Sequence, residues 1–279
     1  MKYTKVSSVS LKEEYGLEGG ELECVCMQTP FDGAPDWKRP AVIVVPGGGY
    51  SMVSRREAMP IASAFLARGF QTFVLTYLCC GDGVRYPEQL LELGCAVDYV
   101  KKHAEEFFVN PDEVFAVGFS AGGHLTANLA VEYPTLSEKL GREVEGKPAA
   151  VGLVYPVIST ETGYVGSHNN LLNGYTDEAK EELLKTLNLD NAVSETTAPA
   201  FLLSTAQDAL VPATNAMRFA TALAKHKVDY ELHVYPCGSH GGATFDYEVN
   251  TDRNPDFIRN RRWLDDCATF FRRYTKEVF

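Results

Sequence analysis

The sequence predicts an α/β fold: a mainly parallel, doubly wound sheet flanked by helices. Apolar segments rich in β-branched residues alternate along the chain with amphipathic helical segments, which is typical of this class. Residues 41–45 (AVIVV) are apolar throughout, as expected for a strand buried on both faces of a parallel sheet. We find no internal repeat or linker, so residues 1–279 are predicted to form a single domain.

In the first half of the chain, alternating polarity predicts two opening strands, and longer apolar periodicity predicts the helices. Gly69 and Pro87 supply suitable helix end and start signals. The predicted elements are strands over 3–11, 21–28, 41–45 and 71–77, and helices over 58–68 and 87–103.

The second half continues the alternation of strands and helices. Predicted strands cover 114–117, 149–155, 200–205 and 230–235, and predicted helices cover 124–130, 212–226 and 256–273. Residues 159–198 differ, because they are polar, contain several Asn and Gly, and include a single helical stretch over 177–187. We therefore predict that residues 159–198 are a cap inserted over the sheet edge within the same domain.

A nucleophile is predicted where one strand turns directly into a helix, at residues 118–123 (GFSAGG). Gly118 and Gly122 lack the side chains that would block such a sharp turn, which leaves the Ser120 hydroxyl exposed at the strand end. A Gly-x-Ser-x-Gly stretch also arises by chance in roughly one chain in ten of this length. The preceding strand and following helix favour the functional interpretation.

Asp208 and His240 also follow predicted strands, and strand carboxyl ends meet at one edge of a parallel sheet. A serine hydroxyl needs a base near neutral pH, which histidine provides, and a carboxylate holds the imidazole in one tautomer. The alternatives are a turn or helix-capping aspartate and a solvated loop histidine. The other histidines are weaker candidates. His233 lies within a predicted strand, His124 is expected in the core at the start of the helix after Ser120, and three follow no strand: His103, His168 and His226.

Three consecutive glycines, residues 47–49, follow the buried strand at 41–45. Such a loop lets the backbone approach a ligand and aim N–H groups at it. We predict that Gly48 and Gly49, together with the N–H of Ala121, form an oxyanion hole, while an ordinary glycine-rich turn is the alternative. A phosphate-binding loop is not predicted, because no Gly-Lys-Ser/Thr follows.

The composition of the chain argues against several classes of binding partner. The net charge of −11 argues against nucleic acid and anionic membrane surfaces. No apolar run is long enough to span a bilayer and the N-terminus does not resemble a signal peptide, so a cytoplasmic location is predicted. The seven cysteines form neither a disulfide framework nor a zinc pattern, so we predict buried thiols, no metal and no cofactor.

With these motifs in view, the chain resembles the α/β-hydrolase serine esterases, chiefly bacterial acetyl-xylan and feruloyl esterase-like and hormone-sensitive-lipase-like carboxylesterases. The resemblance runs from about residue 41 to the C-terminus through VVPGGGY at 44–50, RYP at 85–87, GFSAGGHL at 118–125, DALVP at 208–212 and GSHG at 238–241. It implies that Ser120 is the nucleophile, His240 the general base and acid, and Asp208 its orienting carboxylate. Gly48, Gly49 and Ala121 would hold the oxyanion.

Two departures refine the resemblance. Pro46 stands where lipase-like members carry His, and Tyr77-Leu78-Cys79-Cys80 replaces their Tyr-Arg-Leu segment. Both favour the sugar-acetate esterases, so the expected substrate is a small-molecule ester, such as an acetylated xylo-oligosaccharide. A peptidase of the oligopeptidase type and a non-catalytic binding protein of the same fold remain alternatives. The oligomeric state and the roles of Tyr50, Tyr164 and Tyr175 stay open.

Overall fold

A single sheet forms the centre of the computed structural model, which describes residues 4–28, 37–251 and 253–276. Its strands are β1 (Thr4–Ser10), β2 (Glu21–Met27), β3 (Arg39–Val45), β4 (Gln71–Thr76), β5 (Val109–Phe119), β6 (Val151–Val154), β7 (Ala200–Thr205) and β8 (Tyr230–Tyr235). They lie in the order β1-β2-β4-β3-β5-β6-β7-β8. Only the pairings of β2 with β1 and β4 are antiparallel among these strands, so the predicted mainly parallel sheet is confirmed.

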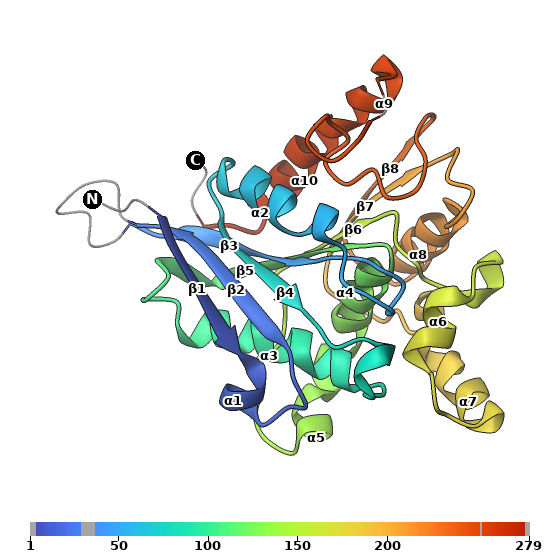
Figure 1. Ribbon diagram of the computed structural model, residues 1–279, viewed down its shortest axis with the longest axis horizontal. Coiled ribbons are helices and arrows are strands. Elements are labelled where there is room, and N and C mark those ends of the chain that lie inside the picture. The colour runs from blue at the N-terminus through green and yellow to red at the C-terminus, as the bar shows by residue number, and fades with distance from the viewer. Residues whose placement is uncertain (1–3, 29–36, 252, 277–279) are drawn as a thin grey trace.

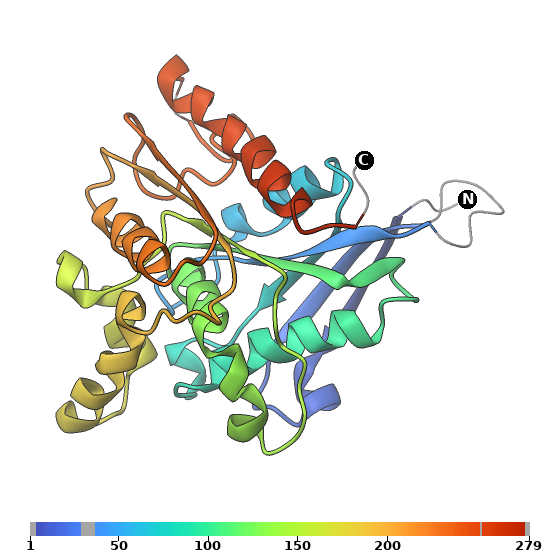
Figure 2. The ribbon, with the colours of Figure 1, turned by 180° about the vertical axis from the view of Figure 1, so that it is seen from behind.

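Helices cover both faces of this sheet (Figures 1 and 2). They are α1 (Leu11–Tyr15), α2 (Met59–Leu66), α3 (Glu88–Lys102), α4 (Ala121–Glu132), α5 (Leu136–Leu140), α6 (Gly166–Leu171), α7 (Asp177–Leu187), α8 (Thr214–Lys225), α9 (Pro255–Arg259) and α10 (Trp263–Arg272). Helices α2 and α10 lie on one face, while α3, α4 and α8 lie on the other (Figure 1).

Strand β3 shows why its sequence is apolar throughout. Val42 and Val44 pack with α2 and α10, while Ile43 and Val45 pack on the opposite face, in the cluster that contains α3. All four side chains are fully buried. Since full burial of a β-branched side chain contributes roughly 1.5–3 kcal/mol, both sheet faces stabilise the strand that leads into the glycine-rich segment.

The short helices α1, α5 and α6 were not predicted. Helix α1 carries a recognisable signal, because the Ser10 hydroxyl accepts the Glu13 N–H at 3.3 Å and Gly16 ends the helix at a φ of 69°. The preceding β1 covers residues 4–10 of the opening strand predicted over 3–11. Tyr3 lies outside the described residues, and Leu11 begins α1 instead. Short helices are missed because five residues carry too little periodicity.

Several element boundaries differ from the prediction by one to three residues, and two differences are larger. Strand β5 starts at Val109 rather than at 114, through a register irregularity opposite Arg39 and Ala41. The predicted closing helix over 256–273 is divided into α9 and α10 by a 3₁₀ turn that begins at Asn260. The buried Asn260 amide donates to Cys237 O at 2.6 Å. This hydrogen bond joins the 3₁₀ turn to the loop after β8.

Residues 159–198 hold α6 and α7, which lie beside α4 and α8 at one end of the molecule (Figures 1 and 2). The predicted helix over 177–187 has the bounds of α7 and begins after Thr176, whose hydroxyl accepts the Ala179 N–H at 3.3 Å.

Candidate active site

Ser120 occupies the corner between β5 and α4, with a φ of 54° and a ψ of −116°. A non-glycine residue at positive φ is strained and persists only where the surroundings fix it. A Cβ on Gly118 would lie 2.2 Å from Gly122 O, and a Cβ on Gly122 would lie 2.2 Å from Val45 O. Both positions therefore require glycine for the strand and helix to pack this closely.

His240 lies between Asp208 and Ser120. Its Nδ1 is 2.7 Å from Asp208 Oδ2, and its Nε2 is 2.8 Å from Ser120 Oγ. Asp208 follows β7 and His240 follows β8, so the three residues come from the ends of three parallel strands. The structure thus brings together the predicted nucleophile, base and carboxylate.

The hydrogen bonds around Asp208 indicate which nitrogen of the His240 ring carries the proton. Asp208 Oδ1 accepts the N–H groups of Leu210 (3.0 Å) and Val211 (2.9 Å), which holds Oδ2 towards His240. Because an ionised carboxylate only accepts, Nδ1 of His240 carries the proton, and Nε2 is left to accept the Ser120 hydroxyl. The arrangement suits removal of the Ser120 proton.

The glycine loop, residues 46–49, passes beside Ser120. A Cβ on Gly47 would lie 2.9 Å from Ser120 Cβ, so the two backbones approach closely. Gly48 has a φ of 128°, and a Cβ there would lie 1.9 Å from Met52 O. The Gly48 carbonyl accepts the Ser51 and Met52 N–H groups in a tight turn. Glycine is required here for conformation and for space.

Three backbone donors remain available at this place. Within the described part of the chain, no hydrogen bond engages the N–H groups of Gly48, Gly49 or Ala121. Ala121 is the first residue of α4, where N–H groups have no partner inside the helix. Unengaged donors next to a nucleophile can hold a developing negative charge.

Two buried neighbours of the site were missed by the sequence analysis. Glu57, in the 3₁₀ turn η1 (Arg55–Glu57), and Tyr155, which follows β6, are buried beside the glycine loop and the ring of His240. In the sequence, Glu57 resembles any solvated glutamate before a helix. Nothing in a single chain marks it as buried.

The other histidines lie elsewhere. His124 is fully buried in α4 and His168 is buried in α6, and the Nε2 atoms of both contact Leu187 O, at 3.0 and 3.2 Å. Burial lowers the pKa of His124 to about 3 and that of His168 to about 4. His103 contacts Tyr99 O and His233 contacts Glu231, away from Ser120.

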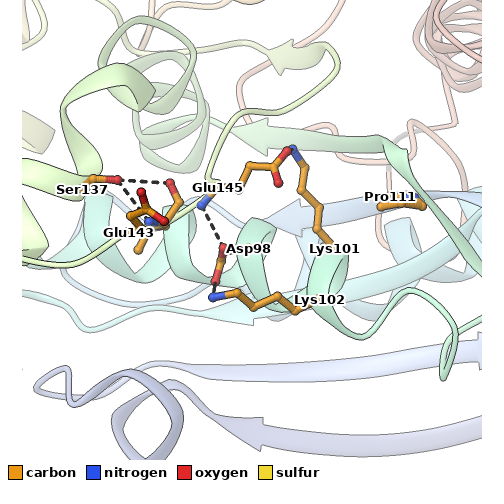
Figure 3. Close-up of a pocket in the computed structure, with 8 residues that line it drawn as sticks. Asp98, Lys101, Lys102, Pro111, Ser137, Glu143 and Glu145 are labelled. Carbon is orange, nitrogen blue, oxygen red and sulfur yellow. Dashed lines mark hydrogen bonds and ion pairs between the residues drawn. The ribbon is translucent and has the colours of Figure 1, made fainter.

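A surface hollow lies between α3 and the segment around 137–145 (Figure 3). Lys102 pairs with Asp98 at 2.7 Å, and Lys101 pairs with Glu145 at 3.0 Å. Each lysine of this hollow therefore faces a carboxylate. None of its described lining residues is a predicted site residue: Asp98, Lys101, Lys102, Pro111, Ser137, Glu143, Val144 and Glu145.

Within the described residues, no group of three or more His, Cys, Asp or Glu side chains is arranged to hold a metal ion. All seven cysteines are free, and five of them are buried: Cys24, Cys26, Cys79, Cys95 and Cys267. Burial raises the pKa of these buried thiols. No helix in the described part of the chain is long and apolar enough to cross a membrane.

A family model matches residues 34–223, which include Ser120, Asp208 and the glycine loop, while His240 lies beyond it. The chain belongs to the BD-FAE family. The predicted resemblance to α/β-hydrolase esterases is thereby confirmed. The relatives and solved structures that match this BD-FAE chain include proteins named acetylxylan esterase, esterase and carboxylesterase.

Two curated relatives are similar over most of this chain. Endo-1,4-beta-xylanase B of Butyrivibrio fibrisolvens is 33% identical over 74% of the chain and 33% of its own length. Acetylxylan esterase of Xylanibacter ruminicola is 34% identical over 74% of the chain and 42% of its own length. The chain thus spans less than half the length of either relative.

A solved structure covers nearly the whole chain. The acetyl ester-xyloside bifunctional hydrolase of Caldicellulosiruptor lactoaceticus matches with a TM-score of 0.79 and 28% identity, over 96% of each chain. The similarity extends past residue 223 and therefore includes the part of the BD-FAE fold that carries His240.

Proposed function

We propose that the protein is a serine esterase that hydrolyses small carboxylic esters. Ser120 attacks the ester carbonyl while His240 Nε2 takes its proton, and Asp208 stabilises the imidazolium that results. The observation that carries the proposal is the pair of distances, 2.7 Å from Asp208 to His240 and 2.8 Å from His240 to Ser120. The strained backbone of Ser120, with a φ of 54°, supports it.

The tetrahedral intermediate would be held by the N–H groups of Gly48, Gly49 and Ala121. These donors have no partner among the described residues, and the glycine loop adjoins Ser120. Removing one donor of this kind costs about 10²- to 10³-fold in kcat. The His240 imidazolium gives its proton to the leaving alcohol. The neutral imidazole then takes a proton from a water molecule, which attacks the acyl-enzyme, and the proton returns to Ser120 as the acid is released.

We propose acetyl esters of xylo-oligosaccharides as the substrate class. The support comes from the relatives named for acetylxylan esterase and acetyl ester-xyloside hydrolase activity. We further propose that residues 159–198 act as a cap over this site within one domain. Asn170 of α6 donates to Gly49 O at 2.7 Å, which ties the segment to a proposed oxyanion residue.

The test compares the wild type with Ser120→Ala on p-nitrophenyl acetate and on acetylated xylo-oligosaccharides. The wild type should release acetate from both, and the variant should lose several orders of magnitude in kcat. Cleavage of the nitrophenyl ester alone would support the proposed esterase activity and contradict the proposed sugar-ester substrate.

A fluorophosphonate probe provides the control, since it labels an activated serine without needing the right substrate. Equal, slow hydrolysis by both proteins together with an unlabelled Ser120 would reject the serine mechanism and favour a non-catalytic protein of this fold.

A further inference from the structure

A buried carboxylate lies beneath the proposed site without belonging to the triad. Glu57 is 5% exposed, and its two oxygens accept hydrogen bonds from two different segments. Oε2 accepts the Gly47 N–H at 2.9 Å, and Oε1 accepts the Tyr155 hydroxyl at 2.8 Å. Both oxygens act only as acceptors, which is the pattern of an ionised carboxylate.

Tyr155 extends this connection to the histidine loop, residues 236–250. Its hydroxyl oxygen accepts the Ala243 N–H at 2.9 Å, three residues after His240. Its ring meets the His240 imidazole edge-on, with 5.0 Å between the centroids. Burial, together with the neighbouring Glu57, raises the pKa of Tyr155, so the hydroxyl keeps the proton that it donates.

The connected residues are strained where they meet the site. Tyr155 has a φ of 37° and Ala243 a φ of 50°, values that non-glycine residues adopt only when the surroundings hold them. On the other side, a Cβ on Gly47 would lie 2.8 Å from Glu57 Oε2 and 2.9 Å from Ser120 Cβ. Gly47 is therefore enclosed between the carboxylate and the serine, next to the proposed oxyanion donor Gly48.

We infer that Glu57 and Tyr155 are positioning residues that couple the glycine loop to the histidine loop. The path runs from the Gly47 N–H through the Glu57 carboxylate and the Tyr155 hydroxyl to the Ala243 N–H. It fixes the oxyanion donors relative to the base, and both must be held within about 0.5 Å of their productive positions around the reacting carbonyl. The inference rests on the proposed esterase function.

The test measures kcat and KM on p-nitrophenyl acetate for Glu57→Gln, Tyr155→Phe and the double variant. Gln offers one acceptor where Glu57 offers two, and Phe keeps the ring but removes the hydroxyl. Each single variant should lose about 10- to 100-fold in kcat with KM little changed, because the geometry of the transition state is affected more than substrate binding. The kcat of the double variant should be only slightly lower than that of the less active single variant, because both substitutions break the same connection.

Tyr15→Phe is the matched control. Tyr15 is a buried tyrosine whose hydroxyl donates to the Asp98 carboxylate at 2.7 Å, away from both loops. This control should lose thermal stability as Tyr155→Phe does, while its kcat stays near that of the wild type. If Glu57→Gln fails to fold, Tyr155→Phe still tests the connection, because its ring remains packed.

Two results would overturn the coupling. One is kcat near the wild-type value in both single variants, which would leave these residues a purely structural role. The other is a double variant whose loss equals the product of the two single losses, because the residues would then act independently. A wild type that neither hydrolyses esters nor reacts with the fluorophosphonate instead rejects the proposed function, and the coupling with it.

Discussion

His240 and His124 lie in one molecule, each hydrogen-bonded at both ring nitrogens, yet only one is suited to act as a base. His240 is flanked by a carboxylate and a serine, and its side chain is 16% exposed. His124 is fully buried between the Tyr50 hydroxyl, at 2.9 Å, and the Leu187 carbonyl, at 3.0 Å. The difference between them is the chemistry of the partners.

The two rings hold opposite tautomers. The carbonyl of Leu187 can only accept, so Nε2 of His124 carries the proton and Nδ1 accepts the Tyr50 hydroxyl. Burial first, and nearby His168 second, lower the pKa of His124 to about 3. No carboxylate faces His124 among its described partners, and the hydrogen bond to the Leu187 carbonyl, which raises the pKa of His124, does not offset the effect of burial. A histidine becomes an effective general base when a neighbouring group such as a carboxylate stabilises its imidazolium form.

The largest expected effect comes from removing each histidine in turn. His240→Ala should lower kcat on the order of 10⁴-fold or more, because the base for Ser120 is lost. His124→Gln should lower kcat by about tenfold or less, while the free energy of unfolding falls by about 1–3 kcal/mol as buried polar partners lose their bonds. Ester hydrolysis and urea denaturation measure the two quantities. Equal losses of kcat would contradict the distinction between the two rings.

Asp208→Asn tests whether the carboxylate makes the difference. The amide can donate to Nδ1 and thereby favour the tautomer in which Nε2 is protonated and cannot take the Ser120 proton. We expect kcat to fall by about 10³- to 10⁴-fold. Asp98→Asn is a matched control at another buried carboxylate, and its kcat should stay close to that of the wild type. An active Asp208→Asn variant would remove Asp208 from the mechanism.

A smaller effect concerns stability in acid. Burial lowers the pKa of His168 to about 4, whereas in the unfolded chain it stays near 6.5. The unfolded state therefore binds more protons below pH 6.5, and the free energy of unfolding falls as the pH drops from about 6.5 towards 4. The loss from His168 amounts to about 3 kcal/mol over this window. His124, with its still lower pKa, acts in the same direction.

His168→Gln separates this contribution from the carboxylates that titrate in the same range. Urea denaturation at pH 7, 6 and 5 should give a shallower loss of stability for the variant than for the wild type, because one buried group no longer titrates. Identical slopes would show that His168 is protonated in the folded protein as readily as in the unfolded chain.

Most of the strands and the longer helices were predictable from local patterns. The apolar run at 41–45, the α7 pattern after Thr176 and the glycine-flanked Ser120 each carry their own signal within a few residues. The prediction failed where a local pattern was too short, as in α1, or where a distant contact changed the outcome, as at Asn260. Asn260 is drawn to Cys237 O, a partner 23 residues away.

The fold class and the residues that carry the proposed chemistry could be predicted from local patterns, because strand ends, glycine turns and the types of reactive side chain are local properties. Which histidine faces a carboxylate and which is buried against a carbonyl became clear from the three-dimensional arrangement of the chain. This arrangement alone revealed that Glu57 connects two loops through Tyr155. Burial and hydrogen-bond partners depend on segments that are distant along the chain, so they follow from packing rather than from any single stretch of sequence.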